Sequence, residues 1–363
     1  VSVGQDLTVT TGGDLTDSGA ITVAGLGTIV STGQNITLGD STTANFGSID
    51  FAGANVSIKE GSAMELAASE ATGTLSLEAN GAITQSGAID ADSTVSFTAG
   101  ANPITLDNSL NDFSGVVSLS NSGTNDIALT DVNDLEFGTI NAGQNLSVTT
   151  SGAISDVGVI TVAGSTTFDN SGGTNAAIVL DSANVFNGAV SFTTDTGSDI
   201  SIVDTTAFDI EALTVNSLSV SAGGNISDSG VLDIATTVFL TTTAGNGNVV
   251  LNQASDFDGV LSVTTDGTGT TSISNLTDSI ELGTITTAQL ALSAAGAITD
   301  SGVITVSGTT AFDNSAGTDA AIDLDSASTY TGDVTFTVDA GSDVTITDNS
   351  AFAIQSGLNV NNL

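Results

Sequence analysis

Apolar and polar residues alternate along nearly the whole chain. Examples are Ile-Thr-Val at 160–162, Val-Ser-Phe at 190–192 and Ile-Ser-Ile at 200–202. A period of two places apolar side chains on one face of a strand and polar side chains on the other. Short runs rich in Gly, Asn, Asp and Ser, such as 170–175 and 194–199, lie between these segments and are typical of turns. Because apolar residues nowhere recur at helical spacing over helix length, the pattern predicts short β-strands and no helix.

The alternation is organised into five copies of a unit of about 72 residues. One phrase, of the type GAITDSGVITVSG, recurs around an apolar anchor. The anchors are Leu15, Ile83, Ile154, Ile226 and Ile298. A second phrase, of the type SDFDGVLSV, recurs half a period away around an aromatic residue. These aromatic markers are Phe46, Phe113, Phe186, Phe257 and Tyr330. Two markers with one period divide the chain into units of approximately 7–74, 75–145, 146–217, 218–289 and 290–363.

Similarity is highest at twice the period. Residues 152–192 align without a gap on residues 296–336, which indicates duplication of a block of two units. The chain starts and stops inside the repeat, without an initiator Met or the basic and apolar segments of a signal peptide. We therefore expect it to be an interior segment of a longer array.

Two β architectures fit such a period. A string of small immunoglobulin-like sandwiches places large aromatic residues in its core and joins modules through linkers. Here aromatic residues are only 4% of the chain, strands are short, and Pro103 is the only proline. A parallel β-helix instead uses short strands, side chains of modest size and many turns. We predict one continuous right-handed parallel β-helix over 1–363, with about three coils per repeat; tandem sandwiches are the alternative. The aromatic markers are then expected to pack in the core or at corners rather than form a sugar-binding surface row.

The formal net charge of −40 reflects a shortage of basic residues, because only 12% of residues are charged and Lys59 is the only base. A nucleic-acid interface needs cations that displace counterions from phosphate, which one lysine cannot supply. Apolar runs of four to six residues are too short to cross a bilayer. The absence of cysteine excludes disulfides and thiolate metal sites. We expect Lys59 to form a local ion pair with Glu60 or Glu65.

Catalysis would have to rest on Asp and Glu, because the chain has no His and no Arg. The candidate pairs, spaced to share one side of a strand, are Asp90 and Asp92, Asp256 and Asp258, and Asp323 and Asp325. Acids of this kind occur in all five units rather than in one cluster. The sequence therefore favours solvated turns and outer faces over a catalytic centre, and predicts that the chain is not an enzyme.

Calcium is the candidate ion, because oxygen-only ligands suit a hard cation. An aspartate recurs at one position of the repeat, and the second unit has Gln85 there. The candidates are Asp17, Asp156, Asp228 and Asp300. At about three coils per repeat these carboxylates would lie roughly 14 Å apart, too far to share an ion. The glycine-rich nonapeptide of dedicated calcium coils does not occur. Calcium thus stays open as a structural ion or counterion, and no other cofactor is expected.

Phrases such as GAITDSGVITVSG and FDGVLSV, in a long array poor in Lys, Cys and Trp, resemble the repeat regions of filamentous-haemagglutinin-like exoproteins and large autotransporter passengers of Gram-negative bacteria. The resemblance covers the whole chain and rests on composition and rhythm. It implies an extracellular or surface-tethered stalk of an adhesin-like protein. It leaves as partners other copies of the chain, or glycans of host or neighbouring cells bound through other regions. A subunit of a self-assembling extracellular filament or sheath is the alternative.

Overall fold

A computed structural model describes residues 1–40, 42–351 and 353–354, and every regular element within them is a β-strand. The chain divides into two compact units, 1–188 and 189–363. The strands of the first unit are β1 (Ser2–Val3), β2 (Leu7–Thr10), β3 (Leu15–Thr16), β4 (Ile21–Ser31), β5 (Ile36–Leu38), β6 (Ala44–Gly53), β7 (Val56–Glu60), β8 (Met64–Leu66), β9 (Ser69–Ala71), β10 (Leu75–Ala79), β11 (Ile83–Gln85), β12 (Ile89–Ala91), β13 (Val95–Thr98), β14 (Ile104–Leu106), β15 (Asp112–Phe113), β16 (Val117–Ser120), β17 (Ile127–Asp131), β18 (Leu135–Ala142), β19 (Leu146–Thr150), β20 (Ile154–Asp156), β21 (Ile160–Val162), β22 (Thr166–Asp169) and β23 (Ile178–Phe186).

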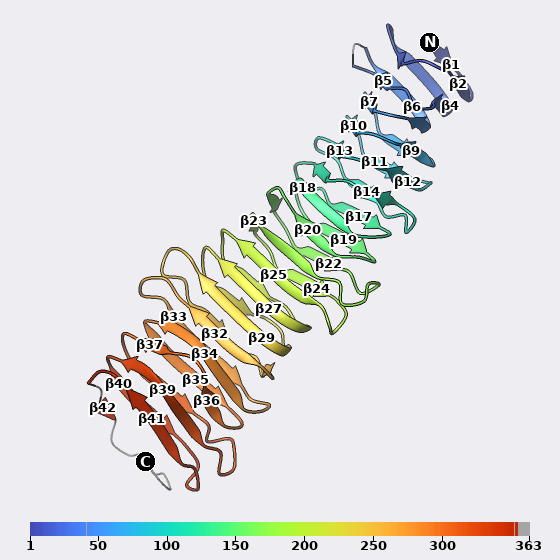
Figure 1. Ribbon diagram of the computed structural model, residues 1–363. Helices are drawn as coiled ribbons and strands as arrows, with labels where there is room; N and C mark the ends of the chain where they lie inside the picture. Colours follow the sequence, from blue (N-terminus) through green and yellow to red (C-terminus); the bar gives the residue numbers. More distant parts are fainter. Residues whose placement is uncertain (41, 352, 355–363) are drawn as a thin grey trace. The chain divides into compact units, whose positions relative to one another are not determined.

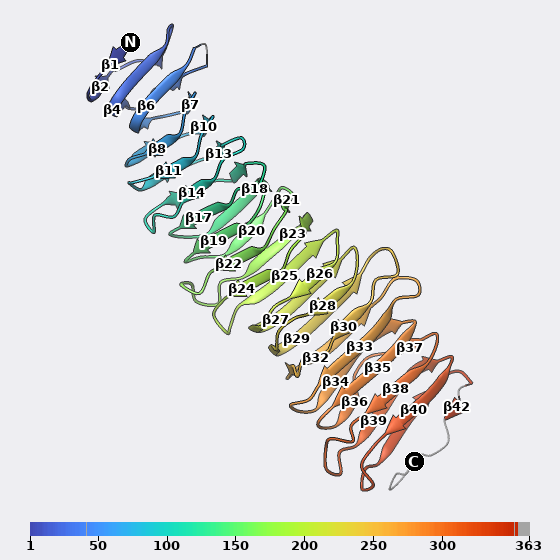
Figure 2. The same cartoon turned by 180° about the vertical axis from the view of Figure 1, so that it is seen from behind.

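The strands of the second unit are β24 (Val190–Thr193), β25 (Asp199–Asp204), β26 (Phe208–Ile210), β27 (Leu213–Ala222), β28 (Ile226–Asp228), β29 (Leu232–Thr242), β30 (Val249–Leu251), β31 (Asp256–Phe257), β32 (Val260–Thr264), β33 (Thr270–Asn275), β34 (Ile280–Thr287), β35 (Gln289–Ala294), β36 (Ile298–Asp300), β37 (Ile304–Val306), β38 (Thr310–Asp313), β39 (Ile322–Tyr330), β40 (Asp333–Thr337), β41 (Val344–Asp348) and β42 (Ala353–Ile354). Figure 1 and Figure 2 show that in each unit the strands wind into coils stacked in chain order.

Both units are parallel β-solenoids, which confirms the predicted fold class. Each strand pairs in parallel with a strand about one coil further along the chain, as when β7 pairs with β10 and β28 pairs with β30. The chain makes about 18 turns, roughly three per repeat. Tandem sandwiches are excluded, because their strands pair mainly in an antiparallel sense within each module.

The strand ladders refine the relation between repeat and coil. In the first unit, β2 connects to β19 through β4, β6, β8, β11, β14 and β17, a path of seven successive pairings. In the second unit, β24 connects to β40 through β26, β28, β30, β33, β35 and β38, again seven pairings. The two ends of each path are equivalent strands two repeats apart. Two repeats therefore make seven coils, and one repeat makes three and a half.

Neighbouring repeats consequently use opposite ladders. Leu218 and Leu290 are equivalent positions one repeat apart in the second unit. Leu218 pairs with Ile200 and Val238, whereas Leu290 pairs with Thr271 and Thr310 in a separate ladder. A coil such as 208–222 contains two short strand segments and one long one. Because each repeat ends after three and a half coils, the next repeat is rotated by half a turn, and its short segments and long segment exchange positions. This half-turn is a physical reason for sequence similarity to be strongest at twice the repeat length.

In each unit the core is a stack of Ile, Leu, Val and Phe side chains from the inward positions of the strands. Coils approach closely at corners occupied by glycine. A Cβ added at Gly259 would collide with the Thr236 carbonyl oxygen, and one added at Gly39 would collide with the Lys59 carbonyl oxygen. Gly39 also has a positive φ of 80°, which glycine adopts without steric cost.

Candidate functional site

The five aromatic markers lie inside the core. Phe46 is 5% exposed, and Phe113, Phe186, Phe257 and Tyr330 are at most 1% exposed. Three of them pack edge-on against a second ring, with centroids about 6 Å apart. These pairs are Phe113 with Phe97 (6.2 Å), Phe186 with Phe168 (6.2 Å) and Tyr330 with Phe312 (6.3 Å). Such edge-to-face pairs add to the stabilisation gained from burial. The markers therefore contribute to packing and not to a surface row.

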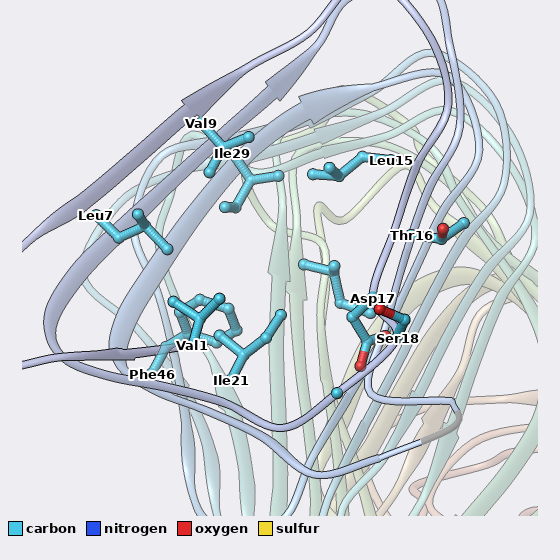
Figure 3. Close-up of a pocket in the computed structure, with 12 residues that line it drawn as sticks. Val1, Leu7, Val9, Leu15, Thr16, Asp17, Ser18, Ile21, Ile29 and Phe46 are labelled. Carbon is cyan, nitrogen blue, oxygen red and sulfur yellow. The ribbon is translucent and has the colours of Figure 1, made fainter.

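The anchors of the first phrase are also core residues, except at the beginning of the chain. Ile83, Ile154, Ile226 and Ile298 have no exposed area. Leu15 is partly exposed, because it lies in the first coil and borders a hollow at that end of the unit. Figure 3 shows this hollow, a cavity of about 370 Å³ lined by apolar side chains such as Leu7, Val9 and Ile29.

A second set of acids, which the sequence analysis missed, points inward and holds the backbone of the aromatic markers. The Phe113 N–H donates to Oδ1 of Asp131 (2.9 Å), and the Tyr330 N–H donates to Oδ1 of Asp348 (3.1 Å). Each acid lies eighteen residues after its aromatic residue and on the next coil. Asp204 and Asn275 occupy the same positions after Phe186 and Phe257, and they are 1% and 0% exposed. These inward acids could have been found in the sequence, because an acid or amide recurs eighteen residues after the aromatic marker.

Burial shifts the pKa of these inward acids upward. Asp131 is 2% exposed, and burial raises its pKa to about 6 against the opposing effect of the Phe113 N–H bond. Glu60, which is 1% exposed, takes a similar role in the first repeat, where its Oε2 accepts the Phe46 N–H (3.4 Å). Burial raises the pKa of Glu60 to about 7. One oxygen of each carboxylate, Oδ2 of Asp131 and Oε1 of Glu60, is buried without a hydrogen-bond partner.

The four calcium candidates act as caps on the following coil. Oδ1 of Asp156 accepts the N–H groups of Asp181 (2.9 Å) and Ser182 (3.2 Å), and its Oδ2 accepts Nδ2 of Asn184 (2.7 Å). Asp17 and Asp228 accept backbone N–H groups from the next coil in the same way. Asp300 accepts the Ser326 N–H (3.3 Å). For Asp228 and Asp300, burial raises the pKa more than these bonds lower it.

The structure does not bring these four aspartates together. One ladder of the first unit connects the strand before Asp17 to the strand that ends at Asp156 through seven successive pairings. The two aspartates are therefore seven coils apart, on the order of 34 Å. Asp228 and Asp300 lie on different ladders of the second unit. Gln85 replaces the aspartate in the second repeat, and its Oε1 accepts Nδ2 of Asn111 (3.0 Å). Among the residues that the structure describes, no three His, Cys, Asp or Glu side chains are grouped so that they could hold a metal ion.

The outward acid pairs form short carboxylate ladders instead of a cluster. Asp90 stands in register with Glu70 on one side and Asp112 on the other. Partial burial first, and then the charges of Asp92, Asp112 and Glu70, raise the pKa of Asp90. In the second unit Asp256 stands in register with Asp233.

The remaining acids of these pairs are dispersed over the second unit. Asp258 follows Asp256, and its N–H donates to the Ile234 carbonyl (3.0 Å). Asp323 and Asp325 lie on the exposed face of β39.

The expected ion pair of Lys59 with Glu60 or Glu65 is wrong. Lys59 Nζ lies 2.6 Å from Oε1 of Glu78, its neighbour in register on the next coil. Alternation explains the difference, because Lys59 points outward while Glu60, the next residue, points inward. Both partners of the pair are about half exposed, so it contributes little to stability. No helix within the described ranges is long and apolar enough to span a membrane.

These observations define a repetitive parallel β-solenoid in which several recurring buried polar side chains join neighbouring coils. The chain belongs to a family described as repeats of unknown function (DUF5649), whose pattern it matches five times, over residues 1–49, 53–120, 124–193, 197–264 and 268–337. No curated protein and no solved structure is significantly similar to it.

Proposed function

We propose that the chain is a non-catalytic stalk segment of a large secreted or cell-surface bacterial protein of the adhesin-like type. Its role is mechanical: it spans distance and presents other regions of the protein. Carbohydrate or cell contact, where it occurs, belongs to those other regions. The bacterial, extracellular setting rests on the resemblance of the repeat phrases to exoprotein arrays and on their composition.

The observation that supports a mechanical role best is the use of recurring polar side chains. Asp156, Asp131 and Asn111 are buried, and each accepts or donates hydrogen bonds to the backbone of a neighbouring coil. Buried polar groups of this kind are costly unless satisfied, and here their bonds hold the ends of strands in place. Their recurrence along the chain fits selection for a regular stack.

The distribution of acids also supports a non-catalytic role. General acid–base catalysis needs titratable groups that converge on one substrate position. Here the acid pairs around Asp90, Asp256 and Asp323 are spread along the two units. Among the cavities beside the described residues are the hollow at the first coil and two grooves lined mainly by Thr, Ser and Ala side chains of the second unit.

A deletion that removes one whole repeat tests the proposal. Removing residues 218–289 joins two equivalent positions, so the shortened chain should fold and be exported, and the cells should display the distal region closer to their surface. Antibody labelling and protease shaving of intact cells measure display, and attachment to target cells measures function. A deletion of half as many residues, 218–253, is the matched control, because it joins inequivalent positions and should prevent folding.

Hydrolysis or cleavage of a polysaccharide by the purified chain, lost on replacing Asp90 and Asp92 by Asn, would overturn the non-catalytic role. Retention of the chain inside intact cells would overturn the surface location. Normal attachment by cells that carry the 218–289 deletion would show that the length of the stalk does not matter.

A further inference from the structure

One outer side of each unit carries no net charge, although the chain contains 41 acids and one base. We call it the neutral side and define it by a row of outward residues that stand in register on seven successive coils. In the first unit the row consists of Lys59, Glu78, Thr98, Ser120, Asn141, Thr161 and Val185. In the second unit it consists of Val203, Ser221, Thr241, Thr264, Thr286, Thr305 and Thr329.

The only base of the chain lies on the neutral side of the first unit. Glu78 is the one acid of that row, and Lys59 lies beside it, with Nζ 2.6 Å from Oε1 of Glu78. The row of the second unit has no charged residue and contains five threonines in succession. Both rows therefore have zero net charge, through an ion pair in one and through neutral residues in the other.

Other ladders of the two units carry outward carboxylates. In the first unit Glu70, Asp90 and Asp112 stand in register on β9, β12 and β15. In the second unit Asp313 and Asp333 belong to β38 and β40. Two copies that approached each other through such surfaces would bring like charges together, which opposes association. The neutral sides allow two copies to meet without that repulsion.

The neutral side of the second unit also carries exposed apolar side chains. Phe239 lies two residues before the row on β29, stands in register with Ser219 and Ser262, and is 51% exposed. Among the described residues it is the one aromatic side chain that is more than half exposed. Val303, also two residues before the row, is 48% exposed. Contact with a second copy would bury these side chains and so gain hydrophobic stabilisation.

We propose that copies of the chain associate laterally, with the neutral side of one copy packed against the neutral side of a second copy. Seven strands about 4.8 Å apart and a width of about four residues give each side about 400 Å², so one pair of sides buries about 800 Å² in total. An area of this size is typical of weak contacts, and we expect association that depends on concentration. Each chain has two neutral sides, and a second contact between the same two copies adds by effective concentration. This goes beyond the proposed function and does not rest on it.

A charge in the middle of the neutral side tests the contact on the full chain. Thr264 is exposed and is the central residue of the row of the second unit. Thr264→Asp adds a carboxylate to each half of the contact, and we expect association, measured by sedimentation velocity, to weaken by at least about tenfold at low NaCl. Ser272→Asp is the matched control, because it adds the same charge at an exposed position of β33, opposite Val250 and Ala291. It should leave association nearly unchanged.

The ion pair gives a second test, in the first unit. Lys59→Gln leaves the carboxylate of Glu78 unbalanced and should weaken association by up to about fivefold at low NaCl. Combining it with Glu78→Gln makes the row neutral again and should restore association. Phe239→Ser should also weaken association, because it removes apolar contact area. Melting temperatures of the variants distinguish a loss of association from a loss of folding.

A parent chain that stays monomeric at millimolar concentration in high NaCl would overturn the proposal. Equal weakening by Thr264→Asp and Ser272→Asp would also contradict it, because the effect would then be one of net charge. Retention of the monomeric parent on cellulose, lost in Thr264→Asp, would assign the neutral side to a glycan instead of a second copy. Failure of lateral association would leave surface display and the effect of the 218–289 deletion unchanged.

Discussion

Asp131 offers a sharp test of how buried acids set the stability of the solenoid. Its pKa is raised from 3.8 to about 6, so the folded chain binds this proton more tightly than the unfolded chain does. The stabilisation that this proton provides is complete below pH 3.8 and is lost as the pH rises through about 6. The rise in the pKa of Asp131 from 3.8 to about 6 corresponds to about 3 kcal/mol of unfolding free energy.

Asp131→Asn removes the charge and keeps an oxygen for the Phe113 N–H. The new amide N–H group replaces Oδ2, which is buried without a partner. In the fourth repeat an amide already occupies the equivalent position, because Asn275 is buried there and its Nδ2 donates to the Ser279 carbonyl (3.0 Å). We expect Asp131→Asn to stabilise the chain by up to about 3 kcal/mol at pH 8 and to have no effect below pH 3.8.

Hydrogen exchange at the Phe113 amide, measured from pH 5 to pH 8, is the appropriate assay because it reports local opening in a long array. Chemical denaturation at pH 3.5 and pH 8 gives the global effect. The reciprocal variant Asn275→Asp is the control and should destabilise at pH 8 alone. An Asp131→Asn variant that is less stable than the parent at pH 8 would refute the reasoning. A variant whose unfolding free energy differs from that of the parent by the same amount at every pH would refute it too.

Further expected outcomes follow from the same contacts. Glu60→Gln should stabilise the chain at pH 8.5 and not at pH 4, because the pKa of Glu60 is raised to about 7; denaturation midpoints at the two values check this. Asp156→Ala should cost about 1–3 kcal/mol, since it leaves the N–H groups of the next coil unpaired, while Asp156→Asn should cost less. Gly259→Ala should cost about 3 kcal/mol because its Cβ meets the Thr236 carbonyl oxygen, which thermal denaturation measures. Melting temperature should rise with NaCl, since one base cannot offset 41 acids; a melting temperature independent of salt contradicts this.

Much of the fold could be predicted because alternation and repetition are direct consequences of stacking. Residues such as Ile154 recur because every coil needs an apolar side chain in the same place. The three and a half coils per repeat could not be predicted, since coil length varies with the loops: 20 residues separate Leu146 from Thr166, and 24 separate Ile154 from Ile178. In the sequence, the half-turn is reflected only in the gapless similarity of 152–192 to 296–336, two repeats further along.

The roles of the acids were harder to predict from composition. Asp131 and Asp156 differ from a turn aspartate only in pointing toward the neighbouring coil, and that direction depends on register. From the sequence alone the acids are expected in solvated turns and on outer faces, whereas several of them are buried acceptors for backbone N–H groups. The partner of Lys59 could not be predicted for the same reason, because Glu78 is nineteen residues away in sequence and next to Lys59 in register.

The distance between Thr8 and Thr149 tests the central claim most directly. Both residues are exposed on outward faces of the first unit, on β2 and β19. Seven pairings connect those strands, so spin labels at the two positions should be on the order of 34 Å apart by pulsed electron resonance. Moving the second label to Thr130, one coil earlier, should shorten the distance by about 5 Å. Equal distances for the two pairs, or a separation near 29 Å for Thr8 and Thr149, would contradict a solenoid with seven coils for every two repeats.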